Sequence, residues 1–313
     1  SLVDALFNFG NETAAFKISG THREQKEGYL TNLVNGEDLG REEYYQITAN
    51  ALFAINENVE IELTFTDEQQ DQDAHTTLNM GGAGTWWCAA YGQCSPGLGV
   101  PQSGNRWAVY NNEPKRRDAF FASKTGILEV RWDISENYKL DYIFGRKTTD
   151  EEVDQDWDGT PLTLYHTDRR AEYEQDSHEL RVTSDLDGNI NFVAGLYKWD
   201  SEYTIPMESR IGFFDLFGAV PRLDPLIVVP IYNYTHQETE SMAVFFEVDY
   251  DINEQFTLTV GGRYIDEEKN SRACQGGGPF PDCAALDTFA KKSWTKFTPK
   301  VALSYQQSDN VLY

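Results

Sequence analysis

The residues best suited to bind a metal ion are three aspartates at alternate positions, Asp154, Asp156 and Asp158, followed directly by Gly159. Alternating carboxylates before a glycine that permits a sharp turn are typical of the first half of a calcium-binding loop. The twelfth position of such a loop falls at Tyr165, where a bidentate glutamate would complete the ligand set. The motif predicts a calcium ion in this loop, and a solvated acidic loop without a metal is the alternative.

A second group of residues is suited to an organic ligand. Aromatic rings can stack on a sugar, on an iron-chelating ring system or on another planar molecule. Several gather in the long polar segment 68–117, namely Trp86, Trp87, Tyr91, Trp107 and Tyr110. We predict that they form a ligand-binding surface. The alternative is that they pack together as a small core of this loop.

The four cysteines form two close pairs. Cys88 and Cys94 lie in one glycine-rich polar segment, and Cys274 and Cys283 lie in another. This arrangement predicts two local disulfides and therefore an oxidising compartment. A four-thiolate metal site is the alternative, although neither pair has the spacing of roughly two to four residues that is usual for structural zinc.

No catalytic group is evident from the sequence. The five histidines show no metal-ligand spacing, and no serine lies in a nucleophile motif. Tyr165 and His166 could contact iron, with an ordinary surface position as the alternative. We therefore expect no enzymatic activity and, apart from the calcium ion, no cofactor.

These residues must be positioned by strands, because the apolar residues repeat with a period of two. In residues 242–250 the even positions are apolar and the odd positions are mostly small or acidic, with Phe245 as the exception. After a short polar turn at residues 253–255 the alternation resumes. The pattern is typical of a β-hairpin with one apolar and one polar face. The charged residues expected on the polar face are Glu247, Asp249 and Arg263, with Arg181 from another strand.

The same hairpin pattern recurs along the chain and predicts about twelve strands. Short turns alternate with long polar connections, predicted at residues 25–41, 68–117, 148–169 and 204–231. An outer-membrane barrel has this asymmetry, because its periplasmic turns are short and its extracellular loops are long. The expected fold is therefore an all-β, antiparallel transmembrane β-barrel. A secreted β-sandwich is disfavoured because it has no reason to place every long insertion at one edge.

The composition agrees with such a fold. The chain has 313 residues, including 17 tyrosines and 18 phenylalanines, and no apolar run approaches the roughly 20 residues of a membrane-spanning helix. The formal charge of −25 argues against nucleic acid as a partner. So acidic a surface is better matched to cations, or to lipopolysaccharide through bridging divalent ions.

Several stretches give a resemblance to a known family. Residues 177–184, SHELRVTS, followed by 192–197, FVAGLY, resemble strands in the barrel of TonB-dependent outer-membrane receptors. The hairpin at residues 243–266 and the segment 297–301, FTPKV, are similar to strands that follow in that family. The resemblance covers most of the chain from about residue 118 onward, and more loosely the part before it.

The resemblance implies a receptor of the bacterial outer membrane that imports a scarce nutrient such as a ferric siderophore, cobalamin or an oligosaccharide. Members of the family have a barrel of about twenty-two strands, a plug domain that fills it, and a TonB box that couples transport to the inner-membrane proton gradient. Residues 1–313 show neither plug nor TonB box, so we interpret them as a partial outer-membrane β-barrel domain. The expected partners are TonB, through the missing N-terminal region, a small-molecule nutrient, and outer-membrane lipid and lipopolysaccharide.

The alternative function is a complete outer-membrane channel or enzyme of about twelve strands, without TonB coupling. A lipase of that size would need a serine and a histidine paired on one outer strand face. The sequence shows no convincing pair of this kind.

Overall fold

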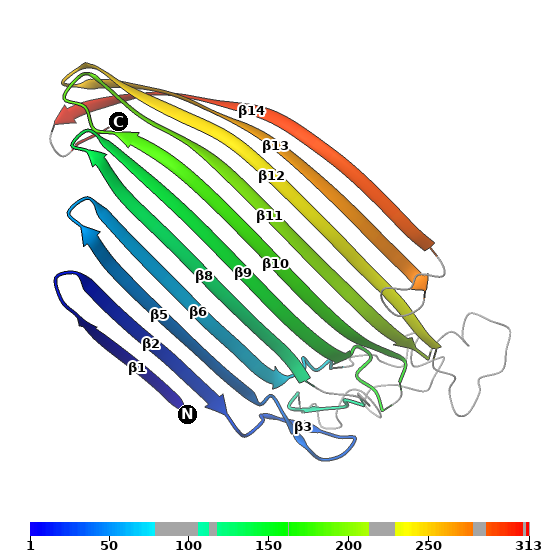
Figure 1. The fold of residues 1–313 in the computed structure, drawn as a ribbon. Coiled ribbons are helices and arrows are strands. Elements are labelled where there is room, and N and C mark those ends of the chain that lie inside the picture. The colour runs from blue at the N-terminus through cyan, green and yellow to red at the C-terminus, as the bar shows by residue number, and fades with distance from the viewer. Residues whose placement is uncertain are drawn as a thin grey trace.

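The computed structural model describes residues 1–78, 106–112, 118–161, 163–212, 229–277, 286–308 and 311–312, which form two sheets. None of the described segments is a helix long and apolar enough to cross a membrane. The large sheet has twelve strands, each paired with its neighbour along the sheet in an antiparallel meander (Figure 1), so the predicted strand number and class are confirmed. Its strands are β1 (Leu2–Gly10), β2 (Ala14–Gln25), β5 (Glu42–Asn56), β6 (Val59–Asp73), β8 (Asp118–Ser135), β9 (Tyr138–Asp156), β10 (Tyr165–Ser184), β11 (Ile190–Ile211), β12 (Val229–Asn253), β13 (Phe256–Gly277), β14 (Leu286–Ser308) and β15 (Val311–Leu312).

Short turns join the strands at one end of the sheet, and asparagine side chains build several of them. The Oδ1 of Asn11 accepts hydrogen bonds from the backbone N–H groups of Thr13 and Ala14, both at 2.9 Å. Asn56 and Asn253 bond the backbone of their own turns in the same way. An asparagine that bonds its own backbone two or three residues further on stabilises a tight turn. The turns therefore help to set the register of the hairpins.

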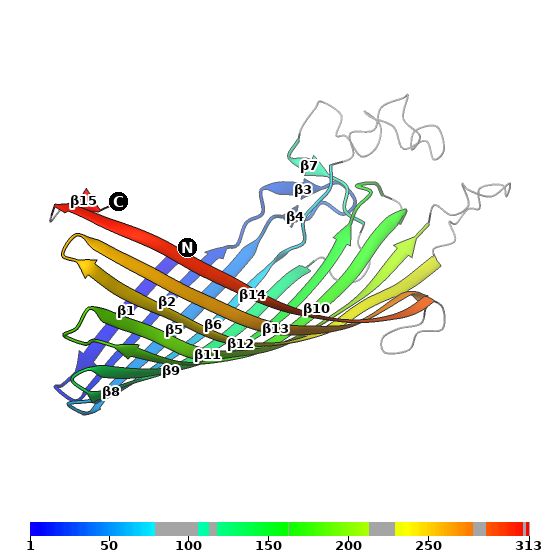
Figure 2. The ribbon, with the colours of Figure 1, turned by 90° about the horizontal axis from the view of Figure 1, so that it is seen from above.

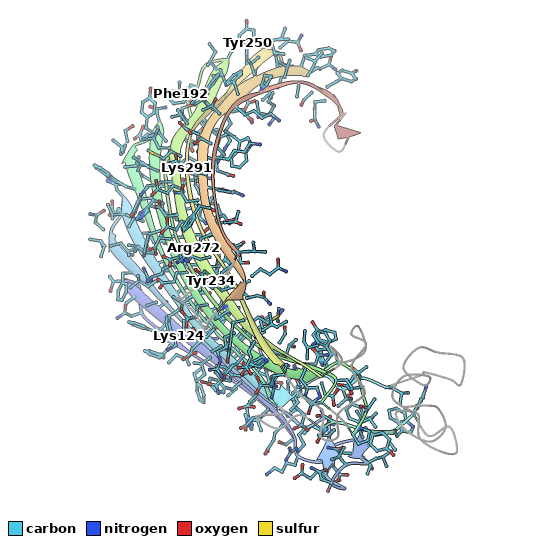
Figure 3. The ribbon with its side chains drawn as sticks, turned by 90° about the vertical axis from the view of Figure 1, so that its right-hand side faces the viewer. Lys124, Phe192, Tyr234, Tyr250, Arg272 and Lys291 are labelled. Atoms are coloured by element: carbon cyan, nitrogen blue, oxygen red, sulfur yellow. The ribbon has the colours of Figure 1, made fainter. Side chains whose placement is uncertain are left out.

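The sheet curls, so that one face is convex and the other is concave (Figure 3). The apolar positions of the strands lie on the convex face, from which Phe192 and Tyr250 project in Figure 3. Large apolar side chains remain exposed there: Val244 is 53 % exposed, Leu196 54 % and Val301 72 %. A continuous apolar surface of this kind is unfavourable in water and is expected to contact lipid.

The concave face carries the polar alternate positions. The charged residues predicted for that face lie on it, namely Arg181, Glu247, Asp249 and Arg263. Their contacts are polar or cation–π: Lys300 donates to Glu247 at 2.6 Å, and the Arg263 guanidinium lies 5.9 Å from the centre of the Phe245 ring. Phe245, the apolar exception on this face, is thus covered by a cation.

Strands β8 to β14 are much longer than a membrane requires. The shortest of them has 18 residues and the longest has 25, whereas about 9–11 residues span a bilayer. Pairing continues through two regions predicted as long connections, 148–169 and 204–231. Strand β9 extends to Asp156 and β10 begins at Tyr165, while β11 extends to Ile211 and β12 begins at Val229. The predicted connections are therefore too long.

The reason is a change of side-chain chemistry along the convex face. Beyond the apolar band the strands present charges that pair across the sheet: Arg146 bonds Asp176 at 2.9 Å and Glu174 at 2.8 Å. Lys198 bonds its strand neighbour Asp200 at 2.8 Å. A strand segment that is polar on both faces shows no alternation of apolar residues. The sequence therefore gives no strand pattern there, although the backbone hydrogen bonds between the strands continue.

A small three-stranded sheet lies beside the end of the large sheet at which the long connections join the strands (Figure 2). It consists of β4 (Asp38–Leu39), β3 (Leu30–Asn32) and β7 (Ala108–Val109), with β3 antiparallel to β4 and parallel to β7. Asn32 is fully buried there. Its side-chain amide donates to the carbonyl oxygen of Asn111 at 3.0 Å, and its Oδ1 accepts from the backbone N–H of Asn111 at 3.2 Å. The small sheet thus ties together two distant parts of the chain.

Candidate functional site

Part of the predicted site lies outside the described residues, namely Trp86, Trp87, Tyr91, Cys88, Cys94 and Cys283. Cys274, at the loop end of β13, is buried and disulfide-bonded. Trp107 and Tyr110 flank the small-sheet strand β7. The described part of the predicted aromatic group is therefore held by the small sheet.

Trp107 contributes to an exposed aromatic surface together with Tyr29, which no sequence pattern marks. The two rings meet edge to face, with centroids 6.1 Å apart and planes at 86°. The guanidinium of Arg106 lies 4.7 Å from the centre of the Trp107 ring. Tyr29 is 60 % exposed and Trp107 is 49 % exposed. Two open rings beside a cation can bind a planar or anionic ligand, and we call Tyr29, Arg106 and Trp107 the aromatic surface.

Two glycines position Tyr29 against the small sheet. A Cβ atom on Gly28 would lie 2.4 Å from the carbonyl oxygen of Leu39 in β4, which no real side chain tolerates. Gly40 has a φ of +97°, and a Cβ there would lie 2.5 Å from the Tyr29 ring. Glycine adopts positive φ and close approach without steric cost. The place of the aromatic surface therefore depends on the backbone of β3 and β4.

The acidic motif does not fold as an open calcium loop. Asp154 and Asp156 belong to β9, where they pair with Asp168 and His166 of β10. Asp158 lies in the turn between the two strands. The residues whose ligand atoms come within 4.8 Å of one another are Asp156, Asp158 and His166. The structure therefore brings an imidazole, in place of the Asp154 carboxylate, to this group, and calcium binding stays a prediction.

The three side chains of this group, which we call the Asp–Asp–His cluster, are enclosed by protein. Their side-chain exposure is 1 % for Asp156, 2 % for Asp158 and 0 % for His166. The Nε2 of His166 lies 3.6 Å from Oδ1 of Asp156 and 3.4 Å from Oδ2 of Asp158. Burial, and then the charge of Asp158, raise the pKa of Asp156 to about 6, while His166 opposes the shift. The cost of removing two carboxylates from water is offset by hydrogen bonds and by nearby positive charge.

Backbone N–H groups hold both carboxylates in place. Oδ1 of Asp156 accepts from Asp158 and Gly159, both at 3.0 Å, and its Oδ2 accepts from Asn112 at 2.9 Å. Gly159 has a φ of 59°, which allows the turn to close around the carboxylate. The backbone donors to Asp158 are Thr160, Leu164 and Tyr165. The bond from Asn112 joins the cluster to the segment that carries β7.

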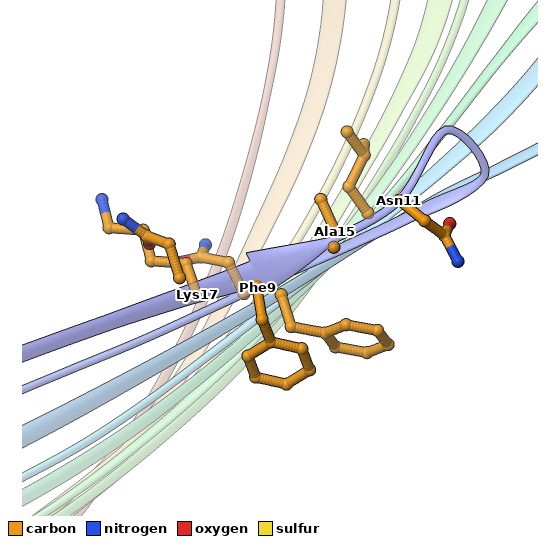
Figure 4. Close-up of a pocket in the computed structure, with 9 residues that line it drawn as sticks. Phe9, Asn11, Ala15 and Lys17 are labelled. Atoms are coloured by element: carbon orange, nitrogen blue, oxygen red, sulfur yellow. The ribbon is translucent and has the colours of Figure 1, made fainter.

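A pocket of about 570 Å³ lies at the opposite end of the sheet, beside the β1–β2 turn (Figure 4). Figure 4 shows that two residues lining this pocket, Phe9 and Lys17, lie on opposite sides of strands β1 and β2. The pocket therefore follows the edge of the sheet, and its lining includes none of the predicted ligand or metal residues. We do not assign it a ligand.

Comparison with known proteins identifies the family. The domain described as "TonB dependent receptor-like, beta-barrel" matches residues 38–312. No curated protein matches the chain significantly. The family match therefore covers most of the sequence, including all strands from β5 onward and, of the small sheet, β4 and β7.

Solved structures share the fold at low identity. The ferric yersiniabactin uptake receptor FyuA from Yersinia pestis matches with a TM-score of 0.69 and 11 % sequence identity. The matched region covers 98 % of this chain and 42 % of the FyuA chain. The siderophore receptor PiuA from Acinetobacter baumannii matches with a TM-score of 0.64 and 13 % sequence identity. The matched region covers 99 % of this chain and 45 % of the PiuA chain. The open form of the ferric-catecholate import receptor Fiu from E. coli K12 has a TM-score of 0.59 and 13 % identity, with coverages of 99 % and 50 %.

This chain thus spans half or less of the length of these receptors. Its convex apolar face, its polar concave face and its alternation of short turns with long connections are those of an outer-membrane barrel wall. Together with the family match over residues 38–312, these features show that the chain belongs to the TonB-dependent receptor family of the outer membrane and forms part of its β-barrel.

Proposed function

We propose that the receptor containing this chain imports a scarce nutrient across the outer membrane, with a ferric siderophore as the favoured ligand and cobalamin or an oligosaccharide as the other candidates. The three similar structures named above are a ferric yersiniabactin uptake receptor, a ferric-catecholate import receptor and a siderophore receptor. The observation that carries the proposal is the exposed aromatic surface, which lies at the long-connection end of a lipid-facing sheet with a polar concave face.

The aromatic surface would receive the ligand by non-covalent contacts. The rings of Tyr29 and Trp107 can stack on planar chelating groups, and the Arg106 cation attracts the negative charge of a ferric chelate. The concave face then offers a hydrated wall whose charges are paired, as Lys300 and Glu247 are. The energy for transport would come from TonB, which contacts an N-terminal region of the receptor. No covalent chemistry is expected.

The convex face would meet lipid in its apolar band and lipopolysaccharide beyond it. There Asp200 of β11 pairs with Glu240 of β12, which pairs with Glu268 of β13. Like charges directly opposite each other destabilise a sheet. Lys198 beside Asp200 and Lys291 beside Glu268 offset part of this repulsion. Divalent ions that bridge the carboxylates to lipopolysaccharide phosphates would relieve the rest. Because the chain has a net charge of −25, we do not propose nucleic acid as a partner.

The intact mass of the native protein, extracted from outer membranes in detergent, separates this proposal from its alternative. A mass near twice the 35.6 kDa of this chain, or more, means that a plug and further strands exist and supports the receptor. A mass of 35.6 kDa means a small self-closing channel or enzyme without TonB coupling.

Uptake is predicted to require TonB. In the native host, deletion of the tonB gene should abolish accumulation of radioactive iron supplied as ferric siderophore, because the ligand cannot pass a closed barrel without energy. Binding of the same ligand to whole cells should remain. Uptake that persists at the wild-type rate without TonB would contradict energy coupling and favour a passive channel.

Trp107→Ala is predicted to weaken ligand binding without changing barrel assembly. A ring contact contributes about 0.5–1.5 kcal/mol, so the dissociation constant should rise roughly two- to twelvefold, measured by equilibrium binding to purified receptor. We predict the same direction for Trp86→Ala and Trp87→Ala. The control Tyr29→Phe keeps its ring and should bind as wild type. Unchanged binding by Trp107→Ala would remove the aromatic surface from the ligand site.

A further inference from the structure

The Asp–Asp–His cluster has a geometry that differs from an ordinary ion pair. A direct charge-assisted N–H···O bond measures about 2.7–2.9 Å. The Nε2 of His166 instead lies 3.4 and 3.6 Å from the nearest oxygens of the two aspartates. Ligand atoms that bind one tetrahedral ion at about 2.0–2.1 Å lie roughly 3.3–3.4 Å from one another. These two spacings from the imidazole nitrogen therefore fit ligand atoms that share one small cation better than they fit direct hydrogen bonds, and the ligand atoms of all three residues lie within 4.8 Å of one another.

The donor set selects the class of cation. Calcium and magnesium are bound by oxygen ligands, whereas imidazole nitrogen with carboxylate oxygen suits zinc and its neighbours among the transition metals. Two carboxylates also supply the negative charge that a buried dication requires. Zinc sites of this type use three protein ligands and leave one position for water. The replacement of Asp154 by His166 in the cluster thus moves the preference away from calcium.

The position of the ligand atoms is set before any ion binds. The carboxylate of Asp156 accepts backbone bonds from Asp158, Gly159 and Asn112. That of Asp158 accepts from the backbone of Leu164 and Tyr165 at 3.0 and 2.8 Å. Partners of this kind orient metal-binding carboxylates and reduce the rearrangement on binding. His166 is fixed by its place in β10, opposite Asp156 in β9.

We propose that Asp156, Asp158 and His166 bind one divalent transition-metal ion of the zinc class. The ion joins the ends of β9 and β10 and, through the bond from Asn112, the segment that carries β7. Asn111, next in the chain, is bonded to the buried Asn32 of β3. The ion therefore stabilises the side of the receptor on which the aromatic surface lies. This inference does not depend on which nutrient the receptor imports.

The test uses the full-length receptor, purified from outer membranes in detergent and stripped of metal with a chelator. Calorimetric titration with zinc sulfate should show one tight site per chain, and titration with calcium chloride should show none at this position. His166→Gln should weaken zinc binding at least about tenfold, because it removes the nitrogen ligand. The matched control is His22→Gln, since His22 also lies beside a carboxylate, Glu43 at 3.1 Å, but on the exposed surface.

A second measurement does not depend on how the variants fold. Cobalt(II) bound to the stripped wild-type receptor should show the intense visible absorption of a four-coordinate site, and zinc should displace it. The proposal is overturned if the wild type binds no zinc, if calcium competes equally for the site, or if His166→Gln and His22→Gln bind zinc alike. None of these outcomes bears on siderophore uptake, so the metal site and the transport function are judged separately.

Discussion

Val301→Arg is expected to prevent assembly of the receptor in the outer membrane. Val301 lies on the convex face, opposite Val260 of β13, and is 72 % exposed. An arginine at the lipid-facing midplane of a barrel costs about 2–4 kcal/mol. A protein domain has about 5–15 kcal/mol of stability in total, so a penalty of this size removes a large share of it. The receptor should be degraded or fail to insert.

The matched control is Ala302→Arg, one residue further along β14. Ala302 lies opposite Thr259 on the concave face, where Lys300 already pairs with Glu247. A charge on this face stays hydrated, so this variant should assemble close to the wild-type level. The measurement is the amount of heat-modifiable receptor in the outer-membrane fraction on unboiled gels. Equal assembly of both variants would contradict the assignment of the convex face to lipid, and loss of only Ala302→Arg would reverse the two faces.

Gly28→Ala is expected to disrupt the small sheet and to weaken ligand binding while the barrel still assembles. The added Cβ would lie 2.4 Å from the carbonyl oxygen of Leu39 and 2.6 Å from its nitrogen, both backbone atoms. Strand β3 must therefore move away from β4, and Tyr29 and Asn32 move with it. A buried amide that loses its partner costs about 1–3 kcal/mol. Loss of both ring contacts, at about 0.5–1.5 kcal/mol each, should raise the ligand dissociation constant roughly five- to 150-fold.

Gly126→Ala is the control for this prediction, because a Cβ at Gly126 of β8 would meet no atom within 4 Å. It should leave both ligand affinity and protease resistance unchanged. Limited proteolysis of intact cells, followed by equilibrium binding, compares the two variants. If Gly28→Ala stays as resistant and as tight as Gly126→Ala, the small sheet does not hold the ligand surface.

The parts of the fold that cross the membrane were readable from the sequence. There the environment differs completely between the two faces of a strand, so each residue's polarity reports its side, as in residues 242–264. The short turns could also be predicted from the sequence, because the side chains of residues such as Asn11 and Asn253 bond the backbone of their own turn. Strand number, the polar face and the family resemblance followed from these local rules.

The extensions of the strands beyond the membrane were not readable, because both of their faces are polar. The pairing of residues 146–156 with residues 166–176 depends on cross-strand partners such as Arg146 with Asp176, which no period reveals. The sequence pattern therefore predicts a long loop for the Asp-x-Asp-Gly motif, which instead begins at the last residue of β9 and leads into the turn to β10. Extending the hairpin register from Tyr142 and Leu180 outward would have paired Asp156 with His166.

The sequence by itself determined a lipid-facing antiparallel sheet with short turns at one end, since that information lies in alternation and in single turn residues. Only the tertiary structure decided which residues meet at the other end. Tyr29 reaches Trp107 through the parallel pairing of β3 with β7, and His166 replaces Asp154 beside Asp156 and Asp158. Contacts of this kind join positions far apart in the chain through hydrogen bonds and burial, and so they leave no local pattern to read.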